Sequence, residues 1–317
     1  MADWLKGDPP VFVFGALRSG TTVFRLMLDA HGEIRNPGEA DYLVDYLEPD
    51  AGHPTGYRYR IEALGDDRVF RAAALDIPPG CDGLDLLNDF LGQLAARKPG
   101  GVLTLNLHRH VDRVAEVLPQ ARIIHLLRDP RDVARSSIGM GWAGTLYHGV
   151  DHWIETEAGW DAVAGRLDPA RVLELTYEAL IRDTEGELRR VCDFLGVPYR
   201  DAMLSYHENT TYERPDIGLI EQWRRKSTPE EVAQVEARAG ALMQRRGYAL
   251  SGPVRPVAPL TRARLAVLDK ARVWRFGVRR FGAACFFGEK MSRRLGMRQL
   301  SRQLRRAMDE RQNAYLK

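Results

Sequence analysis

A loop at residues 15–22 limits the possible folds of this chain more than any other feature. It reads Gly-Ala-Leu-Arg-Ser-Gly-Thr-Thr, and a short apolar run at residues 11–14 comes directly before it. From Thr21 onward, apolar residues recur at helical spacing, so the segment predicts a strand, a tight loop and a helix. Backbone N–H groups at the start of such a helix point into the loop and favour an anion. The segment therefore predicts a phosphate-binding loop.

The loop lacks the lysine of an ATP-hydrolysing loop. Its spacing from Gly15 to Gly20 fits G-x-x-x-x-G, but Thr21 stands where a nucleotide triphosphatase carries lysine. The positive charge lies inside the loop instead, at Arg18. Such a loop suits a nucleotide with a shorter anionic tail than ATP. A nucleotide kinase that uses magnesium is a weaker alternative, and an ordinary surface turn rich in Gly and Ser is another.

A second segment, at residues 121–137, predicts another anion site. Its apolar run at 123–127 is typical of a parallel strand buried on both faces, and Pro130 predicts a helix start. Arg128 would then stand at the carboxyl end of the strand, where open α/β sheets bind ligands. Ser136 lies two turns into the following helix, so both side chains can contact one phosphate. A structural cluster of Arg and Asp at the helix start is the alternative interpretation.

Taken together, these segments resemble those of the sulfotransferases that use 3′-phosphoadenylyl sulfate (PAPS), most closely the bacterial and tyrosylprotein-type members. In that family an R/K-S-G-T-T loop holds the 5′-phosphosulfate, and an Arg and a Ser eight positions apart hold the 3′-phosphate. The corresponding residues here are Arg18, Ser19, Gly20, Thr21 and Thr22 for the first group, and Arg128 and Ser136 for the second. Tyr177 lies in a segment similar to the family's Y-E-D-L motif, which implies a place near the nucleotide.

The resemblance implies that PAPS is the donor, that PAP is the product and that no metal is required. The acceptor would be a hydroxyl or amine of a glycan, a lipid or a small molecule. Like phosphoryl transfer, sulfuryl transfer is expected to spread charge over equatorial oxygens, so positioning and electrostatics supply most of the catalysis. We expect Arg18 and the loop amides to stabilise the bridging oxygen and the sulfuryl group.

Glu39 is the candidate general base, because a base must take the proton from the acceptor. The stretch at residues 36–39 is similar to the G-E segment of tyrosylprotein and related bacterial sulfotransferases, where the glutamate has this role. A solvated loop carboxylate is the alternative. His108 and His110 are rival bases, since cytosolic members of the family use a histidine close to this point. A capping or core role for these histidines is also open.

The chain departs from the family pattern at one place. The usual Lys-Thr stretch appears as Leu-Thr-Leu at residues 103–105, with no lysine. The family's lysine is therefore absent here, and Arg109 or Arg18 is expected to supply its charge-stabilising role.

Strands are expected near residues 11–15, 101–105, 122–127 and 171–175, with helical segments between them. This alternation predicts an α/β fold, namely a P-loop-like parallel sheet with helices on both faces. We expect a catalytic domain at residues 1–252 and a basic helical extension at residues 253–317. The Gly-rich, aromatic segment at residues 138–148 is a candidate for a mobile acceptor gate. Residues 223–226 resemble a W-R stretch near the nucleotide, although a solvated helix face explains them almost as well.

Charge is distributed unevenly along the chain. Residues 253–317 hold 17 Lys and Arg against 4 Asp and Glu, a net of +13, whereas the remainder holds 29 against 39, a net of −10. Aromatic residues interleave with arginines in this extension, which is typical of a helix lying on an anionic membrane surface. A contact with a second subunit, packing on the catalytic domain and, least favoured, nucleic-acid binding are the alternatives.

Three cysteines lie far apart and predict neither a disulfide framework nor a metal site. No signal peptide is visible in the first ten residues, so we expect a cytoplasmic protein, associated with the inner face of the membrane if the extension binds lipid. An enzyme transferring a sulfuryl group from PAPS is the favoured function. The alternative is a membrane- or partner-docked protein that binds the nucleotide without turnover.

Overall fold

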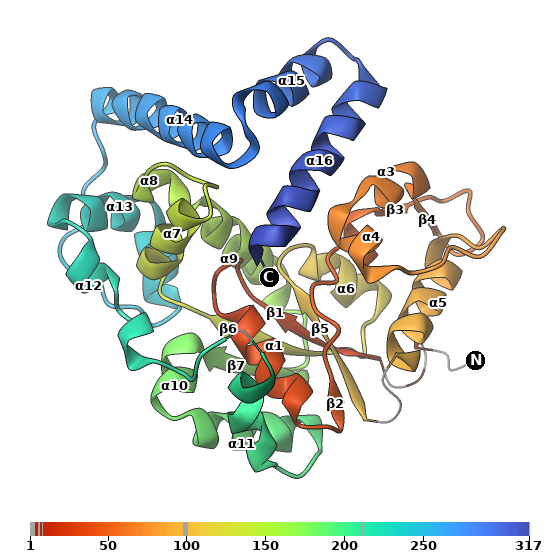
Figure 1. Ribbon diagram of the computed structural model, residues 1–317. Helices are drawn as coiled ribbons and strands as arrows, with labels where there is room; N and C mark the ends of the chain where they lie inside the picture. Colours follow the sequence, from red (N-terminus) through yellow and green to blue (C-terminus); the bar gives the residue numbers. More distant parts are fainter. Residues whose placement is uncertain (1–3, 6, 8, 98–100, 211, 317) are drawn as a thin grey trace. The chain divides into compact units, whose positions relative to one another are not determined.

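The computed structural model describes residues 4–5, 7, 9–97, 101–210 and 212–316. Five parallel strands form a sheet in the order β2-β5-β1-β6-β7 (Figure 1). Their bounds are β1 Val11–Phe14, β2 Ile34–Arg35, β5 Val102–Leu107, β6 Arg122–Leu127 and β7 Val172–Thr176. The four strands expected from the sequence are therefore confirmed. β1 occupies the centre, so the loop that follows it emerges from the middle of the sheet.

Helices cover both faces of the sheet, because its strands are apolar on both sides. Val11 and Val13 of β1 pack into one buried cluster, whereas Phe12 and Phe14 pack into another. The first cluster includes side chains of α1 (Thr21–Ala30), α10 (Tyr177–Arg182) and α11 (Thr184–Leu195). The second includes side chains of α5 (Gly83–Ala96), α6 (Val111–Val117) and α9 (Asp151–Ala164). The α/β fold predicted from the sequence is confirmed.

The chain divides into two compact units. One consists of residues 1–129 and 152–222 and holds the sheet, and the other consists of residues 130–151 and 223–317. The remaining elements of the first unit are α2 Tyr42–Asp45, β3 Leu47–Pro49, β4 Tyr57–Tyr59, α3 Ile61–Asp66, α4 Arg68–Ala73 and three short 3-10 helices, Pro169–Arg171, Asp201–Asn209 and Ile217–Leu219. The helices of the second unit are α7 Pro130–Gly139, α8 Leu146–Gly149, α12 Trp223–Lys226, α13 Pro229–Arg245, α14 Pro259–Phe281, α15 Ala283–Arg294 and α16 Arg298–Leu316. A domain boundary at residue 252 stays a prediction.

β5 ends two residues later than the sequence indicated. Asn106 and Leu107 pair with Val13 and Phe14 of β1, so the strand continues to Leu107. Residues 103–105, which we compared with the family's Lys-Thr stretch, therefore lie inside the strand, and the Thr104 hydroxyl donates to the Arg35 carbonyl at 2.9 Å. The carboxyl end of β5 instead brings Asn106 and His108 to the edge where the loop emerges.

The second unit holds the segment at residues 138–148 against α14. Asp269 of α14 accepts hydrogen bonds from the backbone N–H groups of Gly144 at 2.7 Å and Thr145 at 3.0 Å. Arg272 donates to the Gly144 carbonyl at 2.9 Å. Gly141 has φ 74°, and a side chain there would collide with the Phe276 ring. This segment, which we expected to be a mobile gate, is thus fastened at several points by the C-terminal extension.

Candidate active site

The loop at residues 15–22 requires its glycines because other chain segments pass close to it. Gly20 precedes α1 with φ 93°, and a Cβ there would lie 2.2 Å from the Tyr177 ring. A Cβ on Gly15 would lie 2.4 Å from the Leu126 carbonyl oxygen. Arg18 also has a positive φ, 74°, in the region that glycine usually occupies. The loop therefore follows a path that few other sequences can adopt.

Arg128 stands at the carboxyl end of β6, as the sequence predicted, and contacts the loop. Its two terminal nitrogens donate to the carbonyls of Arg18 and Leu219, each at 2.9 Å. The guanidinium carbon lies 4.3 Å from the centre of the Tyr177 ring. Arg128 and Tyr177 are therefore brought together with the loop, on residues that lie far apart in the sequence.

Two buried polar atoms at this place suit an anionic ligand. Among the residues that the structure describes, Ser19 Oγ and Arg128 Nε are buried without a hydrogen-bond partner. Buried polar groups are normally satisfied, and an exception at a phosphate-type loop calls for an explanation. Oxygens of phosphate or sulfate groups would satisfy both atoms, so the residues present fit a nucleotide with anionic groups.

Ser136 lies on α7 and is half-buried. It belongs to the second compact unit, whereas Arg128 belongs to the first. That Arg128 and Ser136 bind the same phosphate group therefore stays a prediction. Thr21 and Thr22 form the first turn of α1, at the amino end where the helix dipole favours an anion.

Glu39 lies on a short segment that runs beside the end of β5. The Ala40 N–H donates to the Asn106 carbonyl at 2.9 Å, and the Asn106 N–H donates to the Gly38 carbonyl at 3.0 Å. The backbone on both sides of Glu39 is thus fixed, while its side chain is exposed. The Glu39 carboxylate also acts to raise the pKa of Arg18, although burial, the largest influence, leaves that pKa lowered. Glu39 therefore presents an accessible charge close to the loop arginine.

Asn106 links the segment of Glu39 to the phosphate-type loop, and we did not identify it from the sequence. Its side-chain oxygen accepts a hydrogen bond from Asn36 at 3.1 Å, and its amide nitrogen donates to the Thr21 carbonyl at 3.3 Å. Asn36 in turn accepts a hydrogen bond from the Gly38 N–H at 3.0 Å. The available sequence signal was the alternation of Thr104 and Asn106 with three leucines, and the strand end placed two residues too early concealed it.

His108 is buried and bound on both ring nitrogens. Its Nδ1 lies 2.8 Å from Asp41 Oδ2, and its Nε2 lies 3.4 Å from the Thr21 hydroxyl. Burial by itself would lower the pKa of His108, but the Asp41 carboxylate outweighs it and the pKa is raised. The His108 ring in turn lowers the pKa of Asp41 despite the burial of that carboxyl. The pair therefore favours an imidazolium beside a carboxylate.

The side chains of Arg109 and His110 both contact the carboxylate of Asp45, whereas His108 contacts that of Asp41. Arg109 Nε donates to Asp45 Oδ1 at 2.8 Å, and His110 Nε2 lies 3.7 Å from the same oxygen. His110 itself has a left-handed backbone, with φ 55°, at the start of α6. Of the charged residues that follow β5, His108 is thus the one in contact with the phosphate-type loop.

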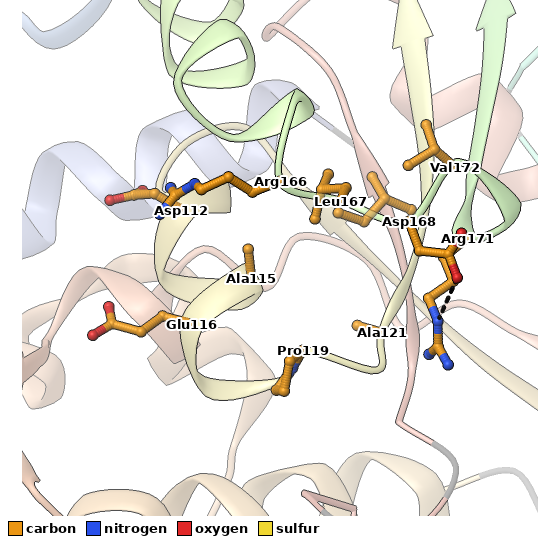
Figure 2. A pocket seen from close by; sticks show the side chains of 11 residues that line it. Asp112, Ala115, Glu116, Pro119, Ala121, Arg166, Leu167, Asp168, Arg171 and Val172 are labelled. Carbon is orange, nitrogen blue, oxygen red and sulfur yellow. Dashed lines mark ion pairs between the residues drawn. The ribbon is translucent and has the colours of Figure 1, made fainter.

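A cavity of about 470 Å³ lies elsewhere in the first unit (Figure 2). Ile123 and Val172, which line it, stand near the amino-terminal ends of β6 and β7, opposite to the loop. An ion pair between Arg171 and Asp168, at 3.7 Å, lies in its wall. No residue of the predicted nucleotide site lines this cavity.

The family model that matches this chain is that of the sulfotransferase family, over residues 9–201. The chain is 31% identical to the omega-hydroxy-beta-dihydromenaquinone-9 sulfotransferase Stf3 of Mycobacterium tuberculosis, over 78% of this chain and 77% of that protein. It is 27% identical to a putative protein-tyrosine sulfotransferase of Caenorhabditis briggsae, over 62% of this chain and 69% of the relative. It also matches an uncharacterised protein of Aquifex aeolicus at 26% identity, over 69% of this chain but only 31% of that relative's length.

Among solved structures, the sulfotransferase domain from the curacin biosynthetic pathway has a similar fold. Its TM-score is 0.53 at 17% identity, over 76% of this chain and 98% of that domain. Together with the family match, these findings confirm the resemblance stated from the sequence. The chain belongs to the sulfotransferase family. Its enzyme class is that of the PAPS-dependent sulfotransferases, which release PAP.

Proposed function

We propose that this chain transfers the sulfuryl group of PAPS to a hydroxyl of a lipid or small-molecule acceptor, with Glu39 as the general base. The observation that carries the proposal is the fixed backbone of residues 38–40, which holds an exposed carboxylate near Arg18. A base must reach the proton that it abstracts, and an exposed side chain on a rigid support can do so. An amine or a glycan as acceptor is compatible with the same chemistry.

Each residue has a distinct role in this proposal. Arg18, Ser19, Gly20, Thr21 and Thr22 hold the 5′-phosphosulfate, and Arg128, Ser136 and Tyr177 bind the rest of the nucleotide. Glu39 accepts the proton of the acceptor hydroxyl as the acceptor oxygen bonds to sulfur. The bond from sulfur to the bridging oxygen breaks, and PAP leaves with that oxygen. Arg18 stabilises the charge that develops there, as preorganised donors do in other group transfers.

A lipid hydroxyl is the acceptor class that we favour. The name of Stf3 describes a sulfotransferase acting on an omega-hydroxylated dihydromenaquinone, and this chain matches it over more than three quarters of both lengths. We further propose a cytoplasmic enzyme, which the basic extension at residues 253–317 brings to the inner face of a membrane or to a second subunit. In the part of the chain that the structure describes, no helix meets the length and apolarity needed to span a bilayer.

A transfer assay tests the proposed function. The full chain is incubated with ³⁵S-labelled PAPS and, separately, with a terminally hydroxylated isoprenoid quinone in detergent, a tyrosine-containing peptide and a glycan. We expect label in the quinone. Label in the peptide or the glycan alone would overturn the lipid assignment. Tight PAP binding without transfer to any acceptor would favour a nucleotide-binding protein without turnover.

His108 is expected to act as a cation and not as the base. In that case kcat/KM falls as the pH rises through the raised pKa of His108. Asp41→Asn removes the carboxylate that raises this pKa, so the fall should move to lower pH. A histidine base would give the opposite profile, with activity rising through the same pKa. A pH profile of kcat/KM for the wild type and Asp41→Asn distinguishes the two roles.

The same pair is expected to affect stability. Since the pKa of His108 is raised in the folded state, protonation of His108 stabilises the fold. This stabilisation is complete below the ordinary histidine pKa and is lost as the pH rises through the raised value. Thermal unfolding midpoints of wild type and Asp41→Asn, measured across this interval, should therefore converge toward alkaline pH.

A further inference from the structure

The C-terminal extension carries a row of exposed apolar side chains, here named the α14–α15 ridge. On α14 its members recur every seven residues, so they lie on one side of the helix. On α15 they recur every four residues. The ridge consists of Leu260, Val267 and Trp274 on α14 and of Phe287, Met291 and Leu295 on or just after α15.

The two halves of the ridge are continuous. The rings of Trp274 and Phe287 meet edge to face, with centroids 5.8 Å apart. The exposed fraction is 83% for Leu260 and 72% for Val267, values unusual for large aliphatic residues within a helix. A row of large exposed apolar side chains along two helices, joined by a ring contact, marks an interaction site more often than single scattered apolar residues do.

Other residues of α14 and α15 fasten the extension within its own compact unit. Phe276 packs where a Cβ of Gly141 would stand, and Asp269 caps the backbone of Gly144 and Thr145. Gly277 is buried because the Phe286 ring lies against it. These residues hold the extension in place, so the exposed parts of the ridge side chains remain available for a partner.

The surface around the ridge is strongly basic. By sequence, α14 holds seven Lys and Arg against the single carboxylate of Asp269, and α15 holds three against Glu289. Both carboxylates are largely buried. Asp269 binds the segment at residues 138–148, while Glu289 pairs with Arg305 at 3.3 Å and with Arg293 at 3.6 Å. The acidic groups of these two helices thus face inward.

Lysine ammonium groups lie over one aromatic ring of the ridge and over the neighbouring ring of Phe286. Lys270 Nζ is 5.2 Å from the centre of the Trp274 ring, and Lys290 Nζ is 4.9 Å from that of Phe286. Tryptophan with an adjacent lysine suits the boundary between lipid headgroups and acyl chains, because the ring is amphipathic and the long lysine stem keeps its charge in the polar layer.

We propose that the α14–α15 ridge docks on an anionic lipid bilayer. The apolar members enter the boundary between headgroups and acyl chains, and the lysines and arginines beside them bind headgroup phosphates. A second copy of this chain fits the ridge less well, since it would bring the same basic surface against this one. The inference deepens the proposed function by placing the enzyme where a lipid acceptor would be, but the docking surface rests on its own residues and not on the acceptor's identity.

Vesicle sedimentation with the full chain tests the proposal. Vesicles of equal parts phosphatidylglycerol and phosphatidylcholine are compared with pure phosphatidylcholine, at about 0.15 M and about 1 M NaCl, since salt screens charge attraction. We expect binding to the anionic vesicles only, with most of it lost at the higher salt. Val267→Ser combined with Trp274→Ala should weaken partitioning about tenfold or more, because two large apolar contacts are removed. Lys270→Gln should weaken it about fivefold.

Ile217→Ser is the matched control, because Ile217 is a 66% exposed apolar residue of the first unit, outside the ridge. Its vesicle binding should equal that of the wild type. Unchanged unfolding midpoints show that the ridge variants are folded. The proposal is overturned if the double variant binds vesicles like the wild type, or if light scattering shows a dimer that the double variant loses while vesicle binding persists. None of these measurements requires PAPS or transfer, so failure of the docking surface and failure of the proposed function are distinguishable.

Discussion

Glu39→Gln is expected to lower kcat for sulfuryl transfer by about 10²–10⁴-fold, the usual contribution of a positioned general base. Affinity for PAP should not change, because the loop and Arg128 do not depend on the Glu39 side chain. The backbone on either side of Glu39 is held by Asn106, so the glutamine variant should keep the local structure. Steady-state transfer with saturating PAPS, together with calorimetric titration of PAP, measures both quantities.

Two further variants make this experiment specific. Glu39→Asp retains a carboxylate on a shorter side chain and should keep part of the activity. Glu48→Gln removes an exposed carboxylate that pairs with Arg60 on the surface, and it should have no effect on transfer. If Glu39→Gln retains full kcat, the base lies elsewhere, and the proposed role of Glu39 is wrong.

The second large effect is expected at Arg18. Arg18→Gln should reduce kcat by about 10²–10³-fold, as the loss of one preorganised group that stabilises developing charge does in other enzymes. Burial lowers the pKa of Arg18, and in such a place its charge interacts more strongly than in water. Arg128 donates to the backbone carbonyl of Arg18 and not to its side chain, so this contact should survive the substitution.

Arg18→Lys is the matched variant, since it keeps a positive charge but loses the planar fork of donors. It should be more active than Arg18→Gln and less active than the wild type. Single-turnover rates at saturating PAPS separate this effect from donor binding. Equal single-turnover rates for all three proteins would show that Arg18 does not act on the reacting group.

Local sequence patterns were enough to locate the donor loop and the strands beside it. The apolar runs at residues 11–14 and 123–127 became β1 and β6, and Gly20 proved to be the position where Tyr177 leaves no room for a side chain. The end of β5 was placed two residues too early. Thr104 and Asn106 alternate with Leu103, Leu105 and Leu107, a pattern that also fits a strand to Leu107, and the pairing of Asn106 with Val13 shows that the strand continues.

The roles of the charged residues after β5 also depended on long-range contacts. From the sequence, His108 and His110 were both rival bases, with His108 among the predicted catalytic residues, and Arg109 or Arg18 was expected to replace the missing lysine. The structure gives these residues different partners. Asp41 binds the His108 ring, which also contacts Thr21 at the start of α1. Asp45 binds the side chains of both Arg109 and His110. Asp41 lies 67 positions before His108 in the chain. No local pattern could have indicated which carboxylate each cation would meet.

The sequence by itself determined the strand, loop and helix of the donor site, the alternation of strands and helices, and the basic character of the extension. These features follow from the periodicity, glycine content and charge of short segments. Only the tertiary structure decided that Asn106 ties the segment of Glu39 to the loop, that His108 is paired with Asp41, and that the segment at 138–148 is fastened to α14. Each of those contacts joins residues far apart in sequence, and folding alone sets the distance between them.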